Sequence, residues 1–203
     1  MADTRTLLAY QQFAEDYAER FSSPGLDPGL EAFIDALPAG AHVLDLGCGP
    51  GAAAAKMVSA GLVVDALDAS PEMAALAWKN YALRVKVAGF ESLEAVACYD
   101  GIWANFSLLH APKPDFSRYL SAVHRALKPD GLLHLGMKLG EGEIRDRFGR
   151  FYAYYSQDQL IAALQDTGFR IVAERILRDT GLDGTAFEGI VITARANGST
   201  SGP

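Results

Sequence analysis

The sequence predicts an α/β fold: a mostly parallel sheet of seven strands, an antiparallel last strand, and helices on both faces. Short apolar runs alternate with helix-length segments, which is the pattern of parallel strands joined by crossover helices. The last two runs, 169–177 and 187–194, have no helix-length segment between them, so they should pair antiparallel. The length of 203 residues and the 50% hydrophobic fraction suit one globular domain.

Five further strands are expected at 43–46, 62–67, 84–87, 99–104 and 132–137. Helices are expected at 51–60, 71–83, 115–127 and 156–166. Ser70 before Pro71 predicts the start of the second helix, and Ser156 predicts the start of the fourth. Residues 128–131 (Lys-Pro-Asp-Gly) predict a turn that closes the third helix.

The N-terminal segment predicts a helical cap over residues 1–38. Tyr10, Phe13, Tyr17 and Phe21 recur at helical spacing and would share one face of a helix. A second apolar stripe consists of Leu30, Phe33, Ile34 and Leu37. We expect a single domain over residues 1–196 and a disordered polar tail at 197–203.

Composition excludes several classes of function. The net charge of −7 argues against a nucleic-acid partner, which requires clustered Lys and Arg. No apolar run approaches the roughly 18 residues that span a bilayer, and the N-terminus lacks a signal-peptide pattern. Cys48 and Cys98 are too few for a disulfide framework or an ordinary zinc site. The expectation is a cytoplasmic monomer or homodimer without a metal, a nucleic-acid partner or a membrane partner.

A glycine-rich turn follows the first predicted strand. Gly47, Gly49 and Gly51 let the chain turn sharply and approach a ligand closely. Asp68 ends the next strand about 20 residues later, where a carboxylate can accept hydrogen bonds from a ribose diol. Both a nicotinamide dinucleotide and an amino-acid-bearing nucleoside fit this layout. Asp45 favours the second, because a carboxylate beside the turn would repel a pyrophosphate and attract an ammonium.

Four segments carry a family resemblance: VLDLGCGPG, LDAS, YDGIWANFSLLHAP and LKPDGLLHL. Together they resemble the class I S-adenosylmethionine-dependent methyltransferases over roughly residues 10–194. The resemblance implies a Rossmann-like sheet and methyl transfer from S-adenosyl-L-methionine to a small acceptor, with S-adenosyl-L-homocysteine as product. The segment GEGEIRDRFGRFYAYYS is similar to a bacterial small-molecule branch of this family.

The resemblance also implies cofactor-binding residues. Asp45 would lie near the cofactor ammonium, Asp68 would bind the ribose, and Phe90 with Glu91 would flank the adenine. Many family members carry an Asp near this point that accepts a hydrogen bond from the adenine amino group. In this sequence Glu91 or the backbone would accept that hydrogen bond instead. In chain order the predicted residues are Tyr10, Tyr17, Asp45, Gly47, Cys48, Gly49, Gly51, Asp68, Ala69, Met73, Phe90, Glu91, Ala104 and Asn105.

Catalytic roles are less specified by the sequence. His110, just past the fourth strand, could act as a general base or could simply be a packed histidine. Asn105 could contact substrate or only shape a turn. Residues 138–155 combine charges and aromatic rings, which is typical of a substrate lid but also of a solvated loop. Two rival functions stay open: an NAD(P)-dependent oxidoreductase, and a non-catalytic S-adenosylmethionine-binding protein.

Overall fold

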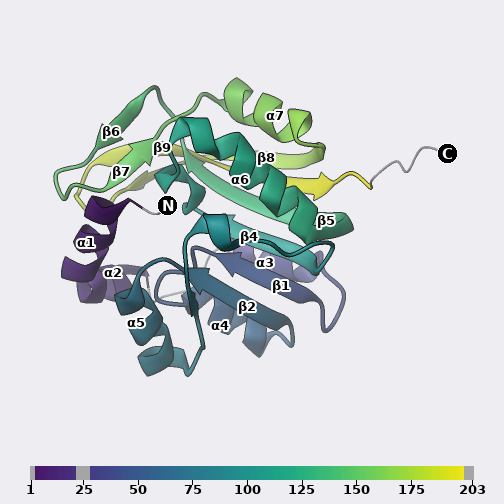
Figure 1. Ribbon diagram of the computed structural model, residues 1–203, viewed down its shortest axis with the longest axis horizontal. Helices are drawn as coiled ribbons and strands as arrows, with labels where there is room; N and C mark the ends of the chain where they lie inside the picture. The colour runs from purple at the N-terminus through teal and green to yellow at the C-terminus, as the bar shows by residue number, and fades with distance from the viewer. Residues whose placement is uncertain (1–2, 22–27, 199–203) are drawn as a thin grey trace.

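The computed structural model describes residues 3–21 and 28–198, apart from the side chains of Asp16, Arg20 and Phe21 (Figure 1). Seven strands form one sheet in the order β3-β2-β1-β4-β5-β9-β8. In chain order the strands are β1 (His42–Leu46), β2 (Val63–Asp68), β3 (Lys86–Val87), β4 (Tyr99–Asn105), β5 (Leu127–Lys138), β8 (Phe169–Thr180) and β9 (Ala186–Ala196). The first five are parallel, and β9 runs antiparallel to both of its neighbours. The predicted fold class is confirmed.

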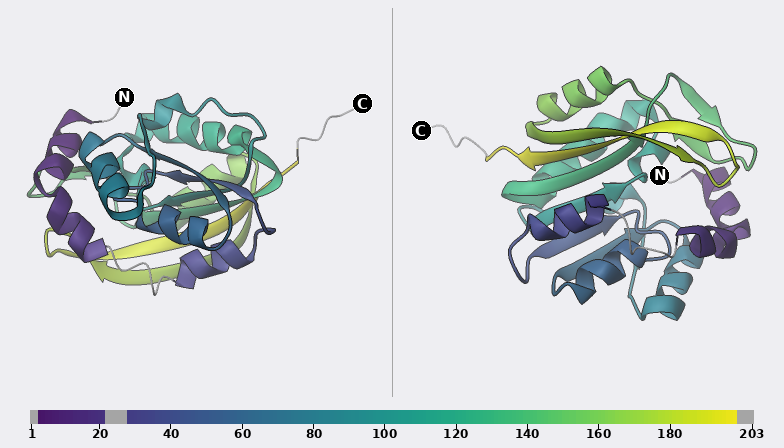
Figure 2. Two further views of the ribbon diagram at one scale, coloured as in Figure 1. Left: turned by 90° about the horizontal axis from the view of Figure 1, so that it is seen from below. Right: turned by 180° about the vertical axis from the view of Figure 1, so that it is seen from behind.

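Helices cover both faces of the sheet (Figure 2). On one face, α6 (Lys113–Ala126) and α7 (Gln157–Asp166) pack over a core that includes Ile102, Leu133 and Ile192. On the other face, α3 (Pro28–Asp35) and α4 (Ala52–Ser59) bury a smaller core with Val43 and Trp103. The helix α5 (Pro71–Tyr81) lies beside β2 and β3. Apolar side chains at alternate positions of the strands therefore pack into two separate hydrophobic layers, one on each face of the sheet.

The N-terminal segment forms two short helices, whereas the sequence predicted one helix with its aromatic residues on a single face. The chain breaks between α1 (Thr4–Gln12) and α2 (Ala14–Phe21), with Phe13 outside both helices. The ring of Phe13 packs against Phe148, with ring centroids 4.4 Å apart, which draws that side chain away from the helical stripe. The side chain of Phe21 lies outside the described residues. Tyr10 and Tyr17 still meet edge to face at 5.5 Å.

The structure differs from the sequence prediction in detail in two further segments. The turn expected at 128–131 lies inside β5, which begins at Leu127 and pairs with β4 irregularly. Asp130 takes a left-handed conformation (φ 61°) there, so the turn survives as a bulge in the strand. The segment expected as a loop or lid contains a hairpin, β6 (Glu143–Arg145) paired with β7 (Phe151–Ala153).

The predicted helix starts are confirmed at two serines. Ser70 Oγ accepts a hydrogen bond from the Met73 backbone N–H, and Pro71 occupies the first turn. Ser156 and Gln159 form a reciprocal capping box at the start of α7. Within the described residues, no helix is both long enough and apolar enough to cross a membrane.

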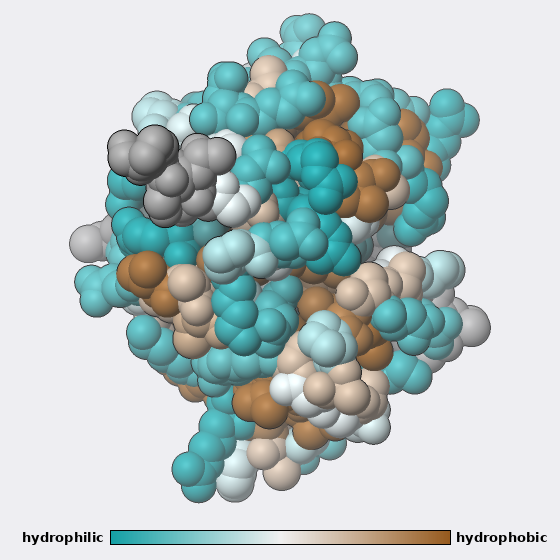
Figure 3. Space-filling view, turned by 90° about the vertical axis from the view of Figure 1, so that its right-hand side faces the viewer, coloured by the Kyte–Doolittle hydropathy of each residue, from teal (hydrophilic) through white to brown (hydrophobic). Residues whose placement is uncertain are grey.

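The carboxyl ends of β1, β2 and β4 lie beside α1 and α2 (Figure 1). Figure 3 shows the opposite end of the molecule, where polar side chains predominate and hydrophobic residues occur in small groups between them. Because ligands of parallel α/β sheets bind beyond the carboxyl ends of the strands, the end beside α1 and α2 is the place to look for a site.

Candidate active site at the carboxyl ends of the strands

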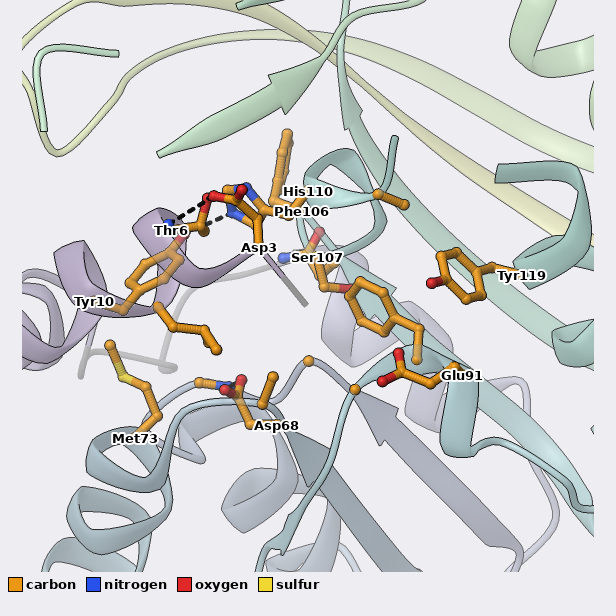
Figure 4. A pocket seen from close by; sticks show the side chains of 18 of the residues that line it. Asp3, Thr6, Tyr10, Asp68, Met73, Glu91, Phe106, Ser107, His110 and Tyr119 are labelled. Carbon is orange, nitrogen blue, oxygen red and sulfur yellow. Dashed lines mark hydrogen bonds between the residues drawn. The ribbon is translucent and has the colours of Figure 1, made fainter. Parts of the chain in front are cut away.

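Two adjoining cavities open at this end of the sheet. The first is lined by residues from α1, the glycine turn, β2, α5 and the segments after β3 and β4 (Figure 4). The second is wider and extends toward β5, β8 and the β6–β7 hairpin. Tyr10, Tyr17, Gly47, Asn105 and His110 line both cavities.

The glycine turn approaches the segment after β4 closely. A Cβ on Gly47 would overlap the Cβ of Ser107, whose hydroxyl donates to the Leu46 carbonyl over 2.6 Å. Gly51 has a different role, because a Cβ there would come 2.9 Å from the side chains of Ala77 and Leu83. Gly51 thus permits α4 to pack against α5, and it lines neither cavity.

Asp68 holds the turn from the end of β2. Its Oδ2 accepts from the Gly49 N–H and its Oδ1 accepts from the Ser70 N–H, both over 2.8 Å. Burial raises the pKa of Asp68, while these backbone hydrogen bonds oppose the rise. A carboxylate has about four acceptor positions, so Asp68 can still accept hydrogen bonds from a diol while it orients the turn.

Asp45 lines the second cavity. It is 2% exposed, and its Oδ2 has no hydrogen-bond partner among the described residues. Burial, and then the charge of Asp68, raise the pKa of Asp45 to about 8. A buried carboxylate oxygen without a donor is costly, so this oxygen fits the ammonium group of an amino-acid-bearing cofactor.

Aromatic and apolar side chains form the other wall of the first cavity. Phe90 follows β3 and meets Tyr119 of α6 edge to face at 5.6 Å. Met73, Ala69 and Glu91 line the same cavity (Figure 4). The largely apolar wall and the Asp68 carboxylate line the same cavity, which suits an adenine next to a ribose.

Tyr10 and His110 connect α1 to the segment after β4. The Nδ1–H of His110 donates to the Phe151 carbonyl over 2.6 Å, and the Tyr10 hydroxyl lies 2.8 Å from Nε2. Because a carbonyl only accepts, Nδ1 carries the proton, and Nε2 of the neutral ring accepts from Tyr10. Burial lowers the pKa of His110 to about 4, so the ring is neutral at pH 7.

Asn105 ends β4 and is oriented by a buried histidine. The Nε2–H of His134 donates to Asn105 Oδ1 over 3.1 Å, and the His134 ring stacks on Trp103 with centroids 3.5 Å apart. Burial lowers the pKa of His134 to about 3, which keeps it a neutral donor. The amide nitrogen of Asn105 is therefore the group left to donate to a ligand.

Most predicted cofactor-binding residues thus come together around the cavities. Cys48 lines the second cavity and is buried, which raises the pKa of its thiol. Gly51 and Ala104 lie outside both; Ala104 is fully buried in the core beneath the strand end. No group of three or more metal-binding side chains occurs in the part of the chain that the structure describes.

Sequence reasoning missed several cavity residues. Ser107, Gly89 and Tyr119 line the first cavity, while Lys138 and Phe187 line the second. A signal did exist for Lys138, because a single charged residue ends the apolar run of β5 at the carboxyl edge of the sheet. The others depend on contacts between segments far apart in sequence, which no local pattern reveals.

Comparison with known proteins agrees with this geometry. Residues 43–131 match the family model described as a methyltransferase domain. A ubiquinone biosynthesis O-methyltransferase of Xanthomonas oryzae pv. oryzae is 34% identical over 104 residues, which cover 48% of this chain and 43% of that protein. The match therefore spans less than half the length of this curated relative.

Solved structures extend the likeness to nearly the whole chain. A Burkholderia thailandensis 1,6-didemethyltoxoflavin-N1-methyltransferase, solved with S-adenosylhomocysteine bound, has a TM-score of 0.71 and 23% identity over 94% of this chain and 88% of its own. The [4+2]-cyclase SpnF has a TM-score of 0.72 and 17% identity over 96% of this chain and 97% of its own. Residues 43–131 are thus similar in sequence to a methyltransferase domain, and the fold that the motifs predicted is shared with these solved structures over nearly the whole chain.

Proposed function

We propose that this protein transfers a methyl group from S-adenosyl-L-methionine to a small-molecule acceptor. The observation that carries the proposal is the buried Asp45 Oδ2 without a hydrogen-bond partner in the described chain, beside the glycine turn that Asp68 holds. A pyrophosphate at this point would face two carboxylates, which counts against the nicotinamide-dependent alternative. An ammonium would supply the missing donor.

The described side chains would divide the cofactor between them. Asp45 would bind the ammonium, Asp68 would accept from the ribose hydroxyls, and Phe90 would cover the adenine. When bound, S-adenosyl-L-methionine supplies a methyl group attached to a positively charged sulfur. The sulfur keeps the bonding electron pair when the methyl group is transferred. The main task of the protein is therefore to position the acceptor in line with that bond and to exclude water.

An acceptor with an O–H or N–H group would also need to lose a proton. Tyr10 and His110 lie where the two cavities meet, with the neutral His110 Nε2 accepting from the Tyr10 hydroxyl. We propose that a proton from the acceptor passes to this pair, either to His110 directly once Tyr10 turns away or through the Tyr10 hydroxyl. Asn105 would hold the acceptor through its amide N–H groups.

The binding test compares S-adenosylhomocysteine with NAD and NADP by thermal unfolding. A ligand at about 100 times its Kd adds roughly 2.7 kcal/mol. At about 2–4 °C per kcal/mol for a domain of this size, Tm should rise by roughly 5–11 °C with S-adenosylhomocysteine alone. A rise with NAD and none with S-adenosylhomocysteine would refute the proposal.

The transfer test uses S-adenosylmethionine with a ¹³C-labelled methyl group and a pool of small molecules, followed by mass spectrometry. Label should appear in a small molecule, together with S-adenosylhomocysteine. Binding without any transfer would instead favour a non-catalytic S-adenosylmethionine-binding protein. The inactive control is Asp68→Ala, which removes the carboxylate from the proposed ribose site.

A further inference from the structure

A lysine at the end of β5 lies in the second cavity with Asp45 and Asn105. Gly136 of β5 pairs with Asn105 of β4. Lys138 follows Gly136 by two residues, so its side chain lies on the same face of the sheet, about 7 Å farther along the strand. It therefore lies beyond Asn105, on the side away from the glycine turn.

The ammonium of Lys138 lies against two aromatic rings, and Asp183 is the nearby carboxylate whose charge acts most strongly on it. The residue is 9% exposed, and its Nζ lies 4.2 Å from the ring centroid of Tyr152 and 4.3 Å from that of Phe187. In the described part of the chain no carboxylate forms an ion pair with it; the charges of Asp183, Asp146 and Asp179 reach it only through space. Burial lowers the pKa of Lys138, with Arg150 adding to the effect.

A buried lysine without an anionic partner is rare in folded proteins, because its desolvation is not compensated. Two cation–π contacts recover part of that cost. They also hold the ammonium in one place beside the cavity. The arrangement is that of a preformed cationic site whose anion arrives with a ligand.

The neighbouring arginine does not add a second net charge. Arg150 is 3% exposed, and its Nε and Nη2 lie 2.7 and 2.6 Å from Asp146 Oδ2. This ion pair is internally neutral. Arg175 and Asp179, which also line this cavity, carry opposite charges. Lys138 is therefore the cation beside the aromatic rings that forms no ion pair among the described residues, and a ligand carboxylate can supply that partner.

The walls around Lys138 specify the rest of the ligand. Phe106 and Phe187 meet edge to face at 5.8 Å, and both line the cavity together with Tyr152. Gly189 pairs with Lys138 on β9, and a Cβ there would come 3.2 Å from the Phe106 ring. The glycine thus leaves room for that ring, and this part of the wall is aromatic.

We propose that the acceptor is an aromatic molecule bearing a carboxylate, which binds the Lys138 ammonium while the ring lies against Phe106, Phe187 and Tyr152. This inference rests on the proposed function, since it names the acceptor class of the same site. The carboxylate serves as the anchor that sets how far the ring reaches toward Asn105. Neutral aromatic molecules of the same shape would leave the ammonium unpaired in the cavity.

The test uses benzoate and 2-naphthoate, each beside its carboxamide, as ligands of the full chain at pH 7. Affinities are measured by calorimetry with and without saturating S-adenosylhomocysteine. At least one carboxylate should bind tenfold or more tightly than its amide. Lys138→Met, which keeps an unbranched side chain, should abolish that preference by weakening only the acid. Lys138→Gln serves as a second neutral variant if the Met variant does not fold.

The matched control is Lys56→Met on α4, which lines neither cavity and should keep the full preference. The proposal is overturned if no acid binds more tightly than its amide, or if Lys138→Met weakens acid and amide equally. It is also overturned if Lys138→Met weakens S-adenosylhomocysteine instead, which would assign the lysine to the cofactor. Failure of the wild-type protein to bind S-adenosylhomocysteine would count against the proposed function alone, because the ligand-free measurements still compare acid with amide.

Discussion

The Tyr10 hydroxyl donates a hydrogen bond to Nε2 of His110 over 2.8 Å, across 100 residues of sequence. The bond ties α1 to the short helix η3 (Leu108–His110) after β4. His110 is fixed at its other nitrogen by the Phe151 carbonyl of the hairpin. One imidazole thus joins three segments that surround the cavity, and its tautomer follows from its partners.

Removing the Tyr10 hydroxyl should therefore cost stability. In Tyr10→Phe the buried Nε2 acceptor loses its donor, which costs about 1–3 kcal/mol. Chemical denaturation measures this change, with Tyr81→Phe at the end of α5 as the control. In the wild-type protein, ¹⁵N shifts of His110 should show Nδ1 protonated and Nε2 unprotonated from pH 5 to 8. Equal stability of the two variants, or a protonated Nε2, would contradict the assignment.

Asp68→Ala should weaken S-adenosylhomocysteine binding by about 2–4 kcal/mol, because two charge-assisted hydrogen bonds to the ribose disappear. The same change also frees the Gly49 and Ser70 N–H groups that Asp68 now accepts from. Asp68→Asn separates the two effects, since its single carbonyl oxygen keeps one acceptor without the charge. Calorimetry measures the affinity of both variants for S-adenosylhomocysteine. Unchanged affinity in both would show that the ribose binds elsewhere.

Cofactor affinity should depend on pH through Asp45. Its pKa is raised to about 8 in the empty protein, so near pH 7 most molecules carry the proton. An ammonium requires the ionised form, and binding must then release that proton. The affinity for S-adenosylhomocysteine should rise from pH 6 to pH 8 by up to tenfold per unit, the limit for one released proton. Asp45→Asn should bind weakly, with a flat profile; a steep profile in that variant would exclude Asp45 as the source.

The same carboxyl group should make the empty protein less stable as pH rises. Its pKa is about 8 when folded and 3.8 in the unfolded reference, so the folded state binds the extra proton between these values. The stability that this proton confers is complete below about pH 4 and is lost as pH rises through 8. Asp45→Asn should flatten this part of the stability profile, measured by urea denaturation at pH 5, 6, 7 and 8. An unchanged slope would show that other groups cause the pH dependence of stability.

The sequence was most informative where the decisive contacts are local. Asp45 stands two residues before Gly47, and Asp68 ends the next strand, so strand periodicity alone brings both carboxylates to one turn. The serine caps were predictable for the same reason, because Ser70 and Met73 are three residues apart. Such features depend on spacing within one or two elements.

Contacts between distant segments were beyond local patterns. Phe13 lies outside the predicted helical face and packs on Phe148, a contact that residue spacing within the first helix does not predict. The turn within β5 was recognised as a turn, but its incorporation as a bulge depends on pairing with β4. The sequence shows Lys138 as the charged residue that ends the apolar run of β5, but its contacts with Tyr152 and Phe187 depend on the hairpin and on β9.

The two segments predicted as a lid are joined to each other in the structure. Arg145 of β6 donates from Nη1 and Nη2 to the two carboxylate oxygens of Asp3, each over 2.8 Å. The Phe151 N–H of β7 donates to Thr6 Oγ1 over 2.8 Å. α1 and the hairpin therefore share an interface over the cavities, and we expect them to open and close as one unit.

Hydrogen exchange tests this coupling. If α1, α2 and the hairpin form a lid of low local stability, amides in residues 4–21 and 139–155 should both slow when S-adenosylhomocysteine is added, while the central strands change little. Arg145→Gln should remove the charged contact with Asp3, so exchange in both segments of the empty protein should become faster. Arg147→Gln, on the same hairpin but against Phe148 rather than Asp3, is the matched control. Protection confined to residues 47–51 and Asp68 would mean that these segments are ordinary surface structure, and separate responses of the two segments to Arg145→Gln would show that they move independently.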